Sequence, residues 1–152
     1  MAIPLTVLVV FSGCGRTEER LAVDEAAIEA TLEAYLPLLG EAYSTGDVEL
    51  LRDWAAEKEM ARIYKRVMDL ADQGRVLAPT LLQMTVEEVK VWNYSNAFVT
   101  TLEVWDVRSL VVGTEQIVAE ELGQTNRVKY QLERNSESDE GLWRILYRSK
   151  QE

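Results

Sequence analysis

Residues 24–48 decide the fold, and they read DEAAIEATLEAYLPLLGEAYSTGDV. Asp24 is a good N-cap residue, because its side chain can accept a hydrogen bond from an amide of the first helical turn. The apolar residues that follow recur at spacings of three and four, which places them on one helical face: Ile28, Leu32, Tyr35, Leu36, Leu39 and Tyr43. Pro37 lies inside this helix, and we expect it to kink or split the helix near residues 34–36.

Two further helices are predicted after this one. Gly46 can take the left-handed conformation that ends a helix, and Asp47 can cap the next one. A short helix is expected over residues 48–56 and a third over about 57–73, ended by Gly74. The third helix carries one apolar face, made of Met60, Ile63, Tyr64, Val67 and Leu70.

After Pro79 the sequence is rich in Val, Thr, Trp and Tyr, which favours strands. The alternating apolar positions change parity between Val86 and Val89, so the pair Glu87-Glu88 predicts a β-bulge. Residues 93–96 are expected to form a hairpin turn into a long strand over about 97–108.

The remaining chain predicts two more strands. Gly113 falls in a connection, residues 117–121 are ambiguous, and residues 127–134 form a strand. A polar turn over 135–141 leads to the last strand, 142–149, with Trp143, Ile145 and Tyr147 facing one way. Helices followed by a meander of strands predict one α+β domain over residues 24–149, with the helices on one face of an antiparallel sheet.

Composition excludes several functions. The formal charge of −10 disfavours nucleic acid, whose binding requires Lys and Arg at the phosphates, and it disfavours electrostatic attachment to anionic lipids. With one cysteine and no histidine, the chain has no internal disulfide, no His-based triad and none of the usual nitrogen and sulfur ligands of zinc. We predict no metal site and no cofactor.

The first fourteen residues form a separate unit. Residues 2–11 are apolar and uncharged, and Ser12-Gly13-Cys14 follows. This run is too short to span a bilayer as a helix but has the length of a signal-peptide apolar region. Residues 14–23 are polar at first and lack a core pattern, as expected of a tether. The alternative is a buried or fraying N-terminal segment whose cysteine is incidental.

Phe11-Ser12-Gly13-Cys14 resembles the bacterial lipobox, although Phe11 stands where Leu is commonest and no Lys or Arg precedes the apolar run. The resemblance implies a signal peptide over residues 1–13 and lipid attached to Cys14. It further implies a bacterial envelope protein, anchored by lipid and facing the periplasm or the exterior.

Tyr43-Ser44-Thr45-Gly46-Asp47-Val48 and Gly141-Leu142-Trp143-Arg144-Ile145 resemble the nuclear transport factor 2 like superfamily. This resemblance implies a cone-shaped domain, in which a strongly curved antiparallel sheet of about four strands wraps around a long helix. Residues 100–105 and 130–132 are more similar to its non-catalytic branches. Its catalytic members place an Asp inside the cone, often with Tyr or His.

Asp106 is the one weak catalytic candidate, with Tyr35, Tyr43 or Tyr64 as a possible hydrogen-bond donor. A carboxylate in an apolar pocket can act as a general base. Strand parity, however, places Asp106 opposite Trp105 and favours a solvent-facing carboxylate, and the tyrosines have the spacing of core residues.

Three aromatic residues are candidates for binding a partner or a ligand: Trp92, Trp105 and Tyr43. Trp105 and Trp143 are expected to pack in the core, whereas Trp92 can be exposed beside the turn at residue 93. The pairs Glu87-Glu88 and Glu120-Glu121 lack the spacing of a calcium loop and are read as a solvated acidic edge.

Two functions follow from these patterns. The first is a non-catalytic envelope lipoprotein whose domain binds an envelope protein or self-associates. The alternative is a domain that uses the cone as a pocket for a small apolar molecule, as a carrier or as an isomerase- or cyclase-like enzyme. The alternative requires an open cavity with an ionisable residue pointing into it, and the first requires a filled cone and an exposed apolar patch.

Overall fold

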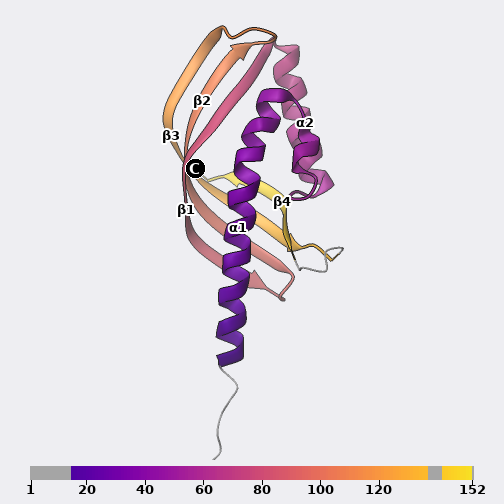
Figure 1. The fold of residues 1–152 in the computed structure, drawn as a ribbon, viewed down its shortest axis with the longest axis vertical. Helices are drawn as coiled ribbons and strands as arrows, with labels where there is room; N and C mark the ends of the chain where they lie inside the picture. Colours follow the sequence, from indigo (N-terminus) through magenta and orange to yellow (C-terminus); the bar gives the residue numbers. More distant parts are fainter. Residues whose placement is uncertain (1–14, 137–141, 152) are drawn as a thin grey trace, which may run out of the picture.

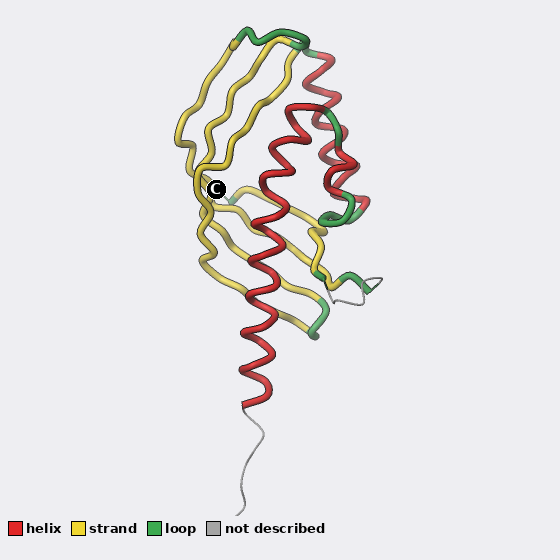
Figure 2. Tube along the Cα trace, viewed as in Figure 1, coloured by secondary structure: helices red, strands yellow, loops and turns green. Residues whose placement is uncertain are grey.

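A computed structural model describes residues 15–136 and 142–151. The predicted signal peptide 1–13, Cys14 and most of the polar turn 135–141 lie outside the described residues. Within them, two α-helices, one short 3-10 helix and four long strands follow each other in the predicted order. The helices lie on one side of a curved antiparallel sheet, which confirms the α+β fold class (Figures 1 and 2).

The first helix, α1 (Gly15–Thr45), is longer than predicted. It begins well before Asp24, so the expected tether is helical from Gly15 onward, and Asp24 is a buried helical residue that pairs with Arg134. Pro37 does not split α1. Proline has no amide hydrogen, so the Glu33 carbonyl lacks its helical hydrogen bond. Both residues lie on the exposed face of the helix, where water can replace that bond.

The chain then turns as predicted at Gly46, whose φ of 80° is left-handed, and Asp47 caps the following 3-10 helix η1 (Val48–Leu51). The helix predicted over 48–56 is shorter and ends at Leu51, because the backbone of residues 54–56 forms hydrogen bonds with the last strand instead. Ala55 forms a parallel bridge with Ile145. Helix α2 (Glu57–Asp72) follows, and Gly74 ends it with a φ of 70°.

The sheet has the order β1-β2-β3-β4, with β1 (Arg75–Trp92), β2 (Asn96–Val111), β3 (Ile117–Arg134) and β4 (Trp143–Lys150). β1 includes Pro79, which an edge strand tolerates. The residues read as ambiguous, 117–121, are the start of β3. A register shift between Val86 and Glu88 confirms the predicted bulge.

The core lies between the inner face of α1 and the inward positions of the strands. Its fully buried large apolar side chains are Ile28, Leu32, Tyr35, Leu36, Leu51, Ile63, Tyr130, Leu132, Trp143 and Ile145. Across the described part of the chain, no helix combines the length and the apolar character that crossing a membrane requires.

Candidate functional site

A buried carboxylate on β2 is the centre of the polar interior of the cone. Thr101, Glu103 and Trp105 alternate along β2 and all point inward, because successive side chains of a strand point to opposite faces. The side chain of Glu103 is fully buried. A carboxylate in this position is stable only if hydrogen bonds and an opposite charge compensate for the water that it has lost.

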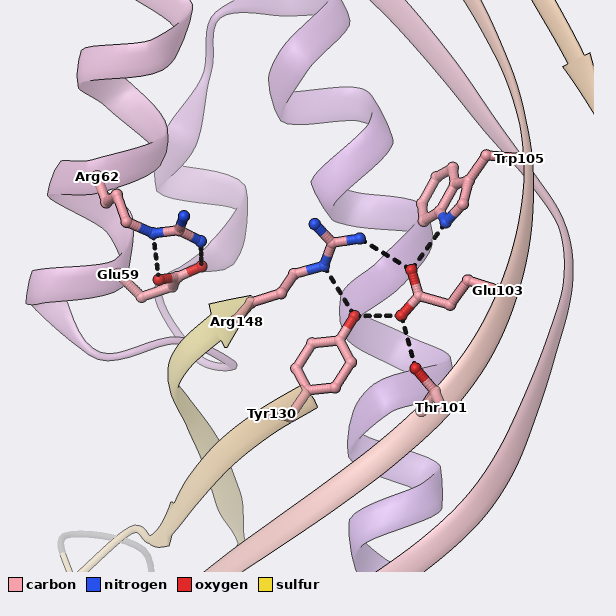
Figure 3. Close-up of polar contacts among 7 residues, drawn as sticks. All are labelled: Glu59, Arg62, Thr101, Glu103, Trp105, Tyr130 and Arg148. Carbon is pink, nitrogen blue, oxygen red and sulfur yellow. Dashed lines mark hydrogen bonds and ion pairs between the residues drawn. The ribbon is translucent and has the colours of Figure 1, made fainter. Parts of the chain in front are cut away.

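Four donors surround the Glu103 carboxylate (Figure 3). Thr101 Oγ1 and the Tyr130 hydroxyl donate to Oε1 over 2.9 and 2.5 Å. Trp105 Nε1 and Arg148 Nη2 donate to Oε2 over 2.8 and 2.9 Å. An ionised carboxylate has about four lone-pair sites that accept hydrogen bonds, and these donors occupy about that many. Glu103 is therefore a saturated structural carboxylate rather than a free base.

Arg148 enters this interior because of a bulge in β4. Gln131 pairs with Tyr147 and Leu132 with Ile145, so Leu146 is an extra residue opposite β3. The extra residue reverses the alternation of β4: Trp143 and Ile145 are buried, but Tyr147 is exposed. The prediction that all three face one way is wrong for Tyr147, and Arg148 points inward in its place, with 18% of its side chain exposed.

The buried groups of the interior shift the pKa values of Arg148 and Tyr130. Burial alone would lower the pKa of Arg148, but the neighbouring Tyr130 and Glu103 outweigh burial and raise it above its ordinary value. Burial also raises the pKa of Tyr130 well above its ordinary value, against the opposing effect of Arg148. Arg148 Nε donates to the Tyr130 hydroxyl over 2.9 Å. The site is therefore a buried ion pair that is bridged by a neutral tyrosine hydroxyl.

A second buried acid lies on α2. Glu59 accepts two hydrogen bonds from Arg62 of the same helix, over 2.9 and 2.6 Å (Figure 3). Burial, and secondarily the charge of Glu59, raises the pKa of Tyr35. The Tyr35 hydroxyl is fully buried and has no hydrogen-bond partner among the described residues.

A cleft of about 460 Å³ opens beside the interior network, between the helices and the overhanging part of the sheet. Two of the predicted aromatic residues, Trp105 and Tyr43, line it together with Arg148. The rest of its lining is mixed, with apolar Leu39, Leu70, Leu77 and Val107, basic Arg66, Arg75 and Lys150, and acidic Glu120 and Glu121.

The other predicted site residues lie apart from this cleft. Asp106 accepts a hydrogen bond from the Gly123 amide over 2.8 Å and so supports a bulge in β3, at which Gly123 has a φ of 62°. Trp92 lies exposed at the β1–β2 turn. The acidic pairs are used in ion pairs, such as Glu87 with Arg127 and Glu120 with Arg108. No cluster of three metal-ligating side chains occurs in residues 15–136 and 142–151.

Sequence reasoning missed Glu103 and Arg148. Glu103 has the same strand parity as Trp105, which was predicted to pack in the core, and that shared parity was the available signal. Arg148 carried no such signal, because the bulge that turns it inward comes from backbone pairing and not from a residue pattern.

The first part of β3 is an uncovered edge. β4 pairs with β3 only from Val128 onward, so residues 117–126 have β2 on one side and no strand of the described chain on the other. Every residue from Ile117 to Gly123 is exposed, including the large apolar Ile117, Val118 and Leu122.

Comparison with known proteins identifies the fold. No protein-family model matches this sequence, and no curated protein matches it. The intermembrane space region of the chloroplast protein ARC6 superposes with a TM-score of 0.69 at 18% identity, over 82% of this chain and 94% of that one. A periplasmic fragment of TraM gives a TM-score of 0.54 at 12% identity, over 84% and 96%.

An NTF2-like protein with a cystatin-like fold from Novosphingobium aromaticivorans gives a TM-score of 0.53 at 18% identity, over 93% of this chain and 90% of that one. The domain has the NTF2-like fold. At these identities the likeness establishes the architecture alone, and the function has to be argued from the site.

Proposed function

We propose that this protein is a non-catalytic binding domain of a lipid-anchored envelope protein. The observation that carries the proposal is the polar interior of the cone, whose buried carboxylate is fully hydrogen-bonded. Glu103, the carboxylate at its centre, is saturated by four donors and neutralised by Arg148. An acid–base enzyme that used Glu103 would require one of its lone pairs to be free and to face a substrate.

The anchor is the lipid on Cys14 implied by the lipobox-like residues 11–14. Helix α1 starts at Gly15, so a lipidated Cys14 would join the base of this helix directly. At a rise of about 1.5 Å per residue, Asp24, the first buried residue of the domain, lies about 15 Å along the helix from Cys14. The first turns of α1 would hold the domain close to the membrane as a helical stalk rather than a flexible tether.

The binding surface is the exposed edge of β3, residues 117–126. Unpaired edge strands are normally protected by charged side chains, Pro or β-bulges. This segment carries Glu120, Glu121 and the bulge at Gly123 but no Lys, Arg or Pro, so its charges repel an acidic strand and attract a basic one. Its exposed apolar residues are interspersed with Glu120 and Glu121. Such an edge fits an extended segment of another envelope protein that adds as a strand and alternates apolar with basic side chains.

Two structural relatives are consistent with this location. The ARC6 region lies in the intermembrane space of the chloroplast, and the TraM fragment lies in the periplasm. Both fragments share only the fold with this chain, so they support an envelope-facing domain and identify no partner.

Photo-crosslinking from Leu122 tests the binding surface in intact cells. We expect a probe at Leu122 to give one discrete product, whose crosslinked partner peptide is extended and basic. The product should be lost when Val118 is changed to Lys, and a probe at the exposed Tyr64 of α2 should not give it. A product that contains two copies of this chain would indicate self-association. No product from Leu122 would contradict the proposal.

The cleft beside Arg148 favours a second candidate, the binding of a small apolar carboxylate. Arg148 Nη1 makes no hydrogen bond within the described residues, and Trp105 and Leu77 supply apolar walls. Saturable binding of dodecanoate that raises the melting temperature, and that Leu77→Trp abolishes by filling the cleft, would favour this function. Absence of binding at millimolar dodecanoate would exclude it.

A further inference from the structure

Two exposed aromatic residues lie at the tip of the β1–β2 hairpin, which we call the hairpin tip: Trp92, 64% exposed, and Tyr94, 52% exposed. Trp92 is the last residue of β1 and Tyr94 belongs to the turn that follows. The tip lies beside the first part of α1, toward the end of the molecule at which that helix begins (Figure 1). The Arg20 guanidinium of α1 stacks over the Tyr94 ring, 4.3 Å from its centroid.

Polar contacts fix the hairpin tip against α1. Arg134 Nε donates to the Tyr94 carbonyl over 2.9 Å, and Arg134 Nη2 pairs with Asp24 of α1 over 2.7 Å. The Arg134 amide donates to the Ser95 carbonyl over 2.8 Å. The two aromatic side chains are therefore presented by a fixed backbone, and little conformational entropy would be lost when they bind.

The backbone of the turn does not favour a tyrosine. Asn93 and Tyr94 have φ values of 51° and 56°, as the two central residues of a type I′ hairpin turn require. Asn tolerates this left-handed conformation, but at the second position Gly is preferred and a bulky residue is an outlier. Tyr94 adds little to the core, and its ring contact within the domain is the one with Arg20, so the strained turn motivates a role for the exposed part of the ring.

We propose that the hairpin tip is a membrane contact: Trp92 and Tyr94 insert into the headgroup region of the bilayer that holds Cys14. The inference rests on the proposed lipid anchor for its geometry. Arg20 is six positions after Cys14, so the tip lies about 9 Å along α1 from the lipidated residue. The headgroup region is roughly 5–8 Å deep on each side of a bilayer, so a modest tilt of α1 brings both rings into it.

The chemistry of the tip fits neutral lipid. Trp and Tyr are enriched at membrane–water interfaces, where an apolar ring and a polar N–H or O–H meet matching surroundings. Arg20 beside Tyr94 can bind a lipid phosphate. The formal charge of −10 opposes anionic lipid, so the contact depends on the aromatic rings and should not require negatively charged vesicles.

Quenching by brominated lipid tests the contact. Full-length protein extracted from bacterial membranes is reconstituted into phosphatidylcholine vesicles with and without bromine on the acyl chains. Of the four tryptophans, Trp105 and Trp143 are buried, Trp54 is half-buried and Trp92 is the most exposed, so Trp92 should dominate any quenching. We expect brominated lipid to quench the wild type clearly, and Trp92→Phe to lose most of that quenching. Vesicle-bound protein that shows no quenching would overturn the inference.

The same samples separate the inference from the anchor. Sedimentation with vesicles reports on the lipid at Cys14, whereas quenching reports on Trp92. Protein that does not sediment but is quenched at millimolar lipid would contradict the anchor and retain the membrane contact. Protein that neither sediments nor is quenched would contradict both.

Tyr94→Gly distinguishes a lipid contact from a structural role. Because Gly prefers the left-handed conformation, this change should raise the melting temperature by relieving the turn. It should at the same time reduce the quenching of Trp92 about twofold or more, since one of the two inserted rings is gone. The matched control is Tyr64→Ala, which removes a tyrosine of similar exposure from α2. Alanine is used there because glycine would weaken the helix. This control should leave the quenching unchanged. Unchanged quenching in Tyr94→Gly would contradict the contribution of Tyr94.

Discussion

Glu103 and Arg148 form the most deeply buried ion pair among the described residues, and their energetics depend on both charges being present. Removing one partner of such a pair leaves an uncompensated buried charge, which costs about 3–5 kcal/mol. Arg148→Met should therefore lower the free energy of unfolding by about that amount. Adding Glu103→Gln, which removes the buried negative charge and keeps one of the two acceptor oxygens, should recover part of the loss.

Urea denaturation of both single variants and the double variant measures this coupling as a double-mutant cycle. An Arg148→Met protein within about 0.5 kcal/mol of the wild type would contradict the assignment of Arg148 to a buried, structural ion pair.

Tyr35 carries a hydroxyl that no described residue satisfies. A buried polar group without a partner costs about 1–3 kcal/mol, so its removal should not destabilise the protein. Tyr35→Phe is expected to unfold at the same urea concentration as the wild type or at a higher one. A marked loss of stability in Tyr35→Phe would show that the hydroxyl has a partner, such as an ordered water molecule.

Three tyrosines should make the folded protein less stable at alkaline pH. Burial raises the pKa of Tyr35, Tyr43 and Tyr130 in the folded state. A raised folded pKa means that the folded state retains protons that the unfolded state releases above about pH 10, the ordinary tyrosine value. The stability contributed by these groups is complete below that pH and falls as the pH rises above it.

The urea midpoint, followed from about pH 8 to pH 11, checks this dependence. We expect a fall that begins near pH 10 and is shallower in Tyr35→Phe, which lacks one of the three titrating groups. A midpoint that stays constant or rises across this range would contradict the burial of these hydroxyls.

At the residue scale, the sequence predicted correctly that Trp105 and Trp143 are buried and that Trp92 can be exposed. It did not predict the ion pair. Glu103 follows the inward parity of its strand, but a charged residue in an apolar pattern is normally read as an interruption. Arg148 has outward parity in an unbulged strand, so only the backbone pairing places it inside.

Among the elements, α1 and β1 approach each other unusually closely at Gly40. A Cβ atom added to Gly40 would lie 2.8 Å from the Pro79 carbonyl oxygen, which is a backbone atom and cannot move aside as a side chain can. Gly→Ala normally stabilises a helix by about 1 kcal/mol, whereas overpacking costs about 1–3 kcal/mol. We expect the clash to prevail and Gly40→Ala to be destabilising.

Thermal denaturation of Gly40→Ala checks this expectation, with Glu41→Ala on the exposed neighbouring position as its control. A Gly40→Ala protein that melts above the wild type would show that α1 can move away from β1 without loss.

The order of the elements was predictable because helical periodicity, the Gly46-Asp47 step and the alternation of the strands are local signals. Two element boundaries were not predictable in this way: the start of α1 and the end of the helical segment at η1. Residues 15–23 have no core pattern because this part of α1 extends beyond the sheet and needs none (Figure 1). The chain after η1 leaves the helical path because Ala55 and Ala56 bond to Ile145, a contact that local sequence does not reveal.

On the scale of the whole molecule, the two proposed surfaces lie at opposite ends. The hairpin tip and the start of α1 mark one end, and the β2–β3 connection with the exposed start of β3 marks the other (Figure 1). A domain anchored at the first end would present the edge of β3 away from the membrane, where another envelope protein can reach it. The resemblance predicted the cone shape, but neither the free edge nor the position of the tip follows from short motifs.

The account depends most on the anchor at Cys14. Intact-mass spectrometry of the protein extracted from bacterial membranes tests it directly, with Cys14→Ser as the control. The account predicts a chain that begins at Cys14 and carries the added mass of the acyl chains, and a Cys14→Ser chain without that mass. A wild-type chain that still begins at Met1, with an unmodified cysteine, would contradict it.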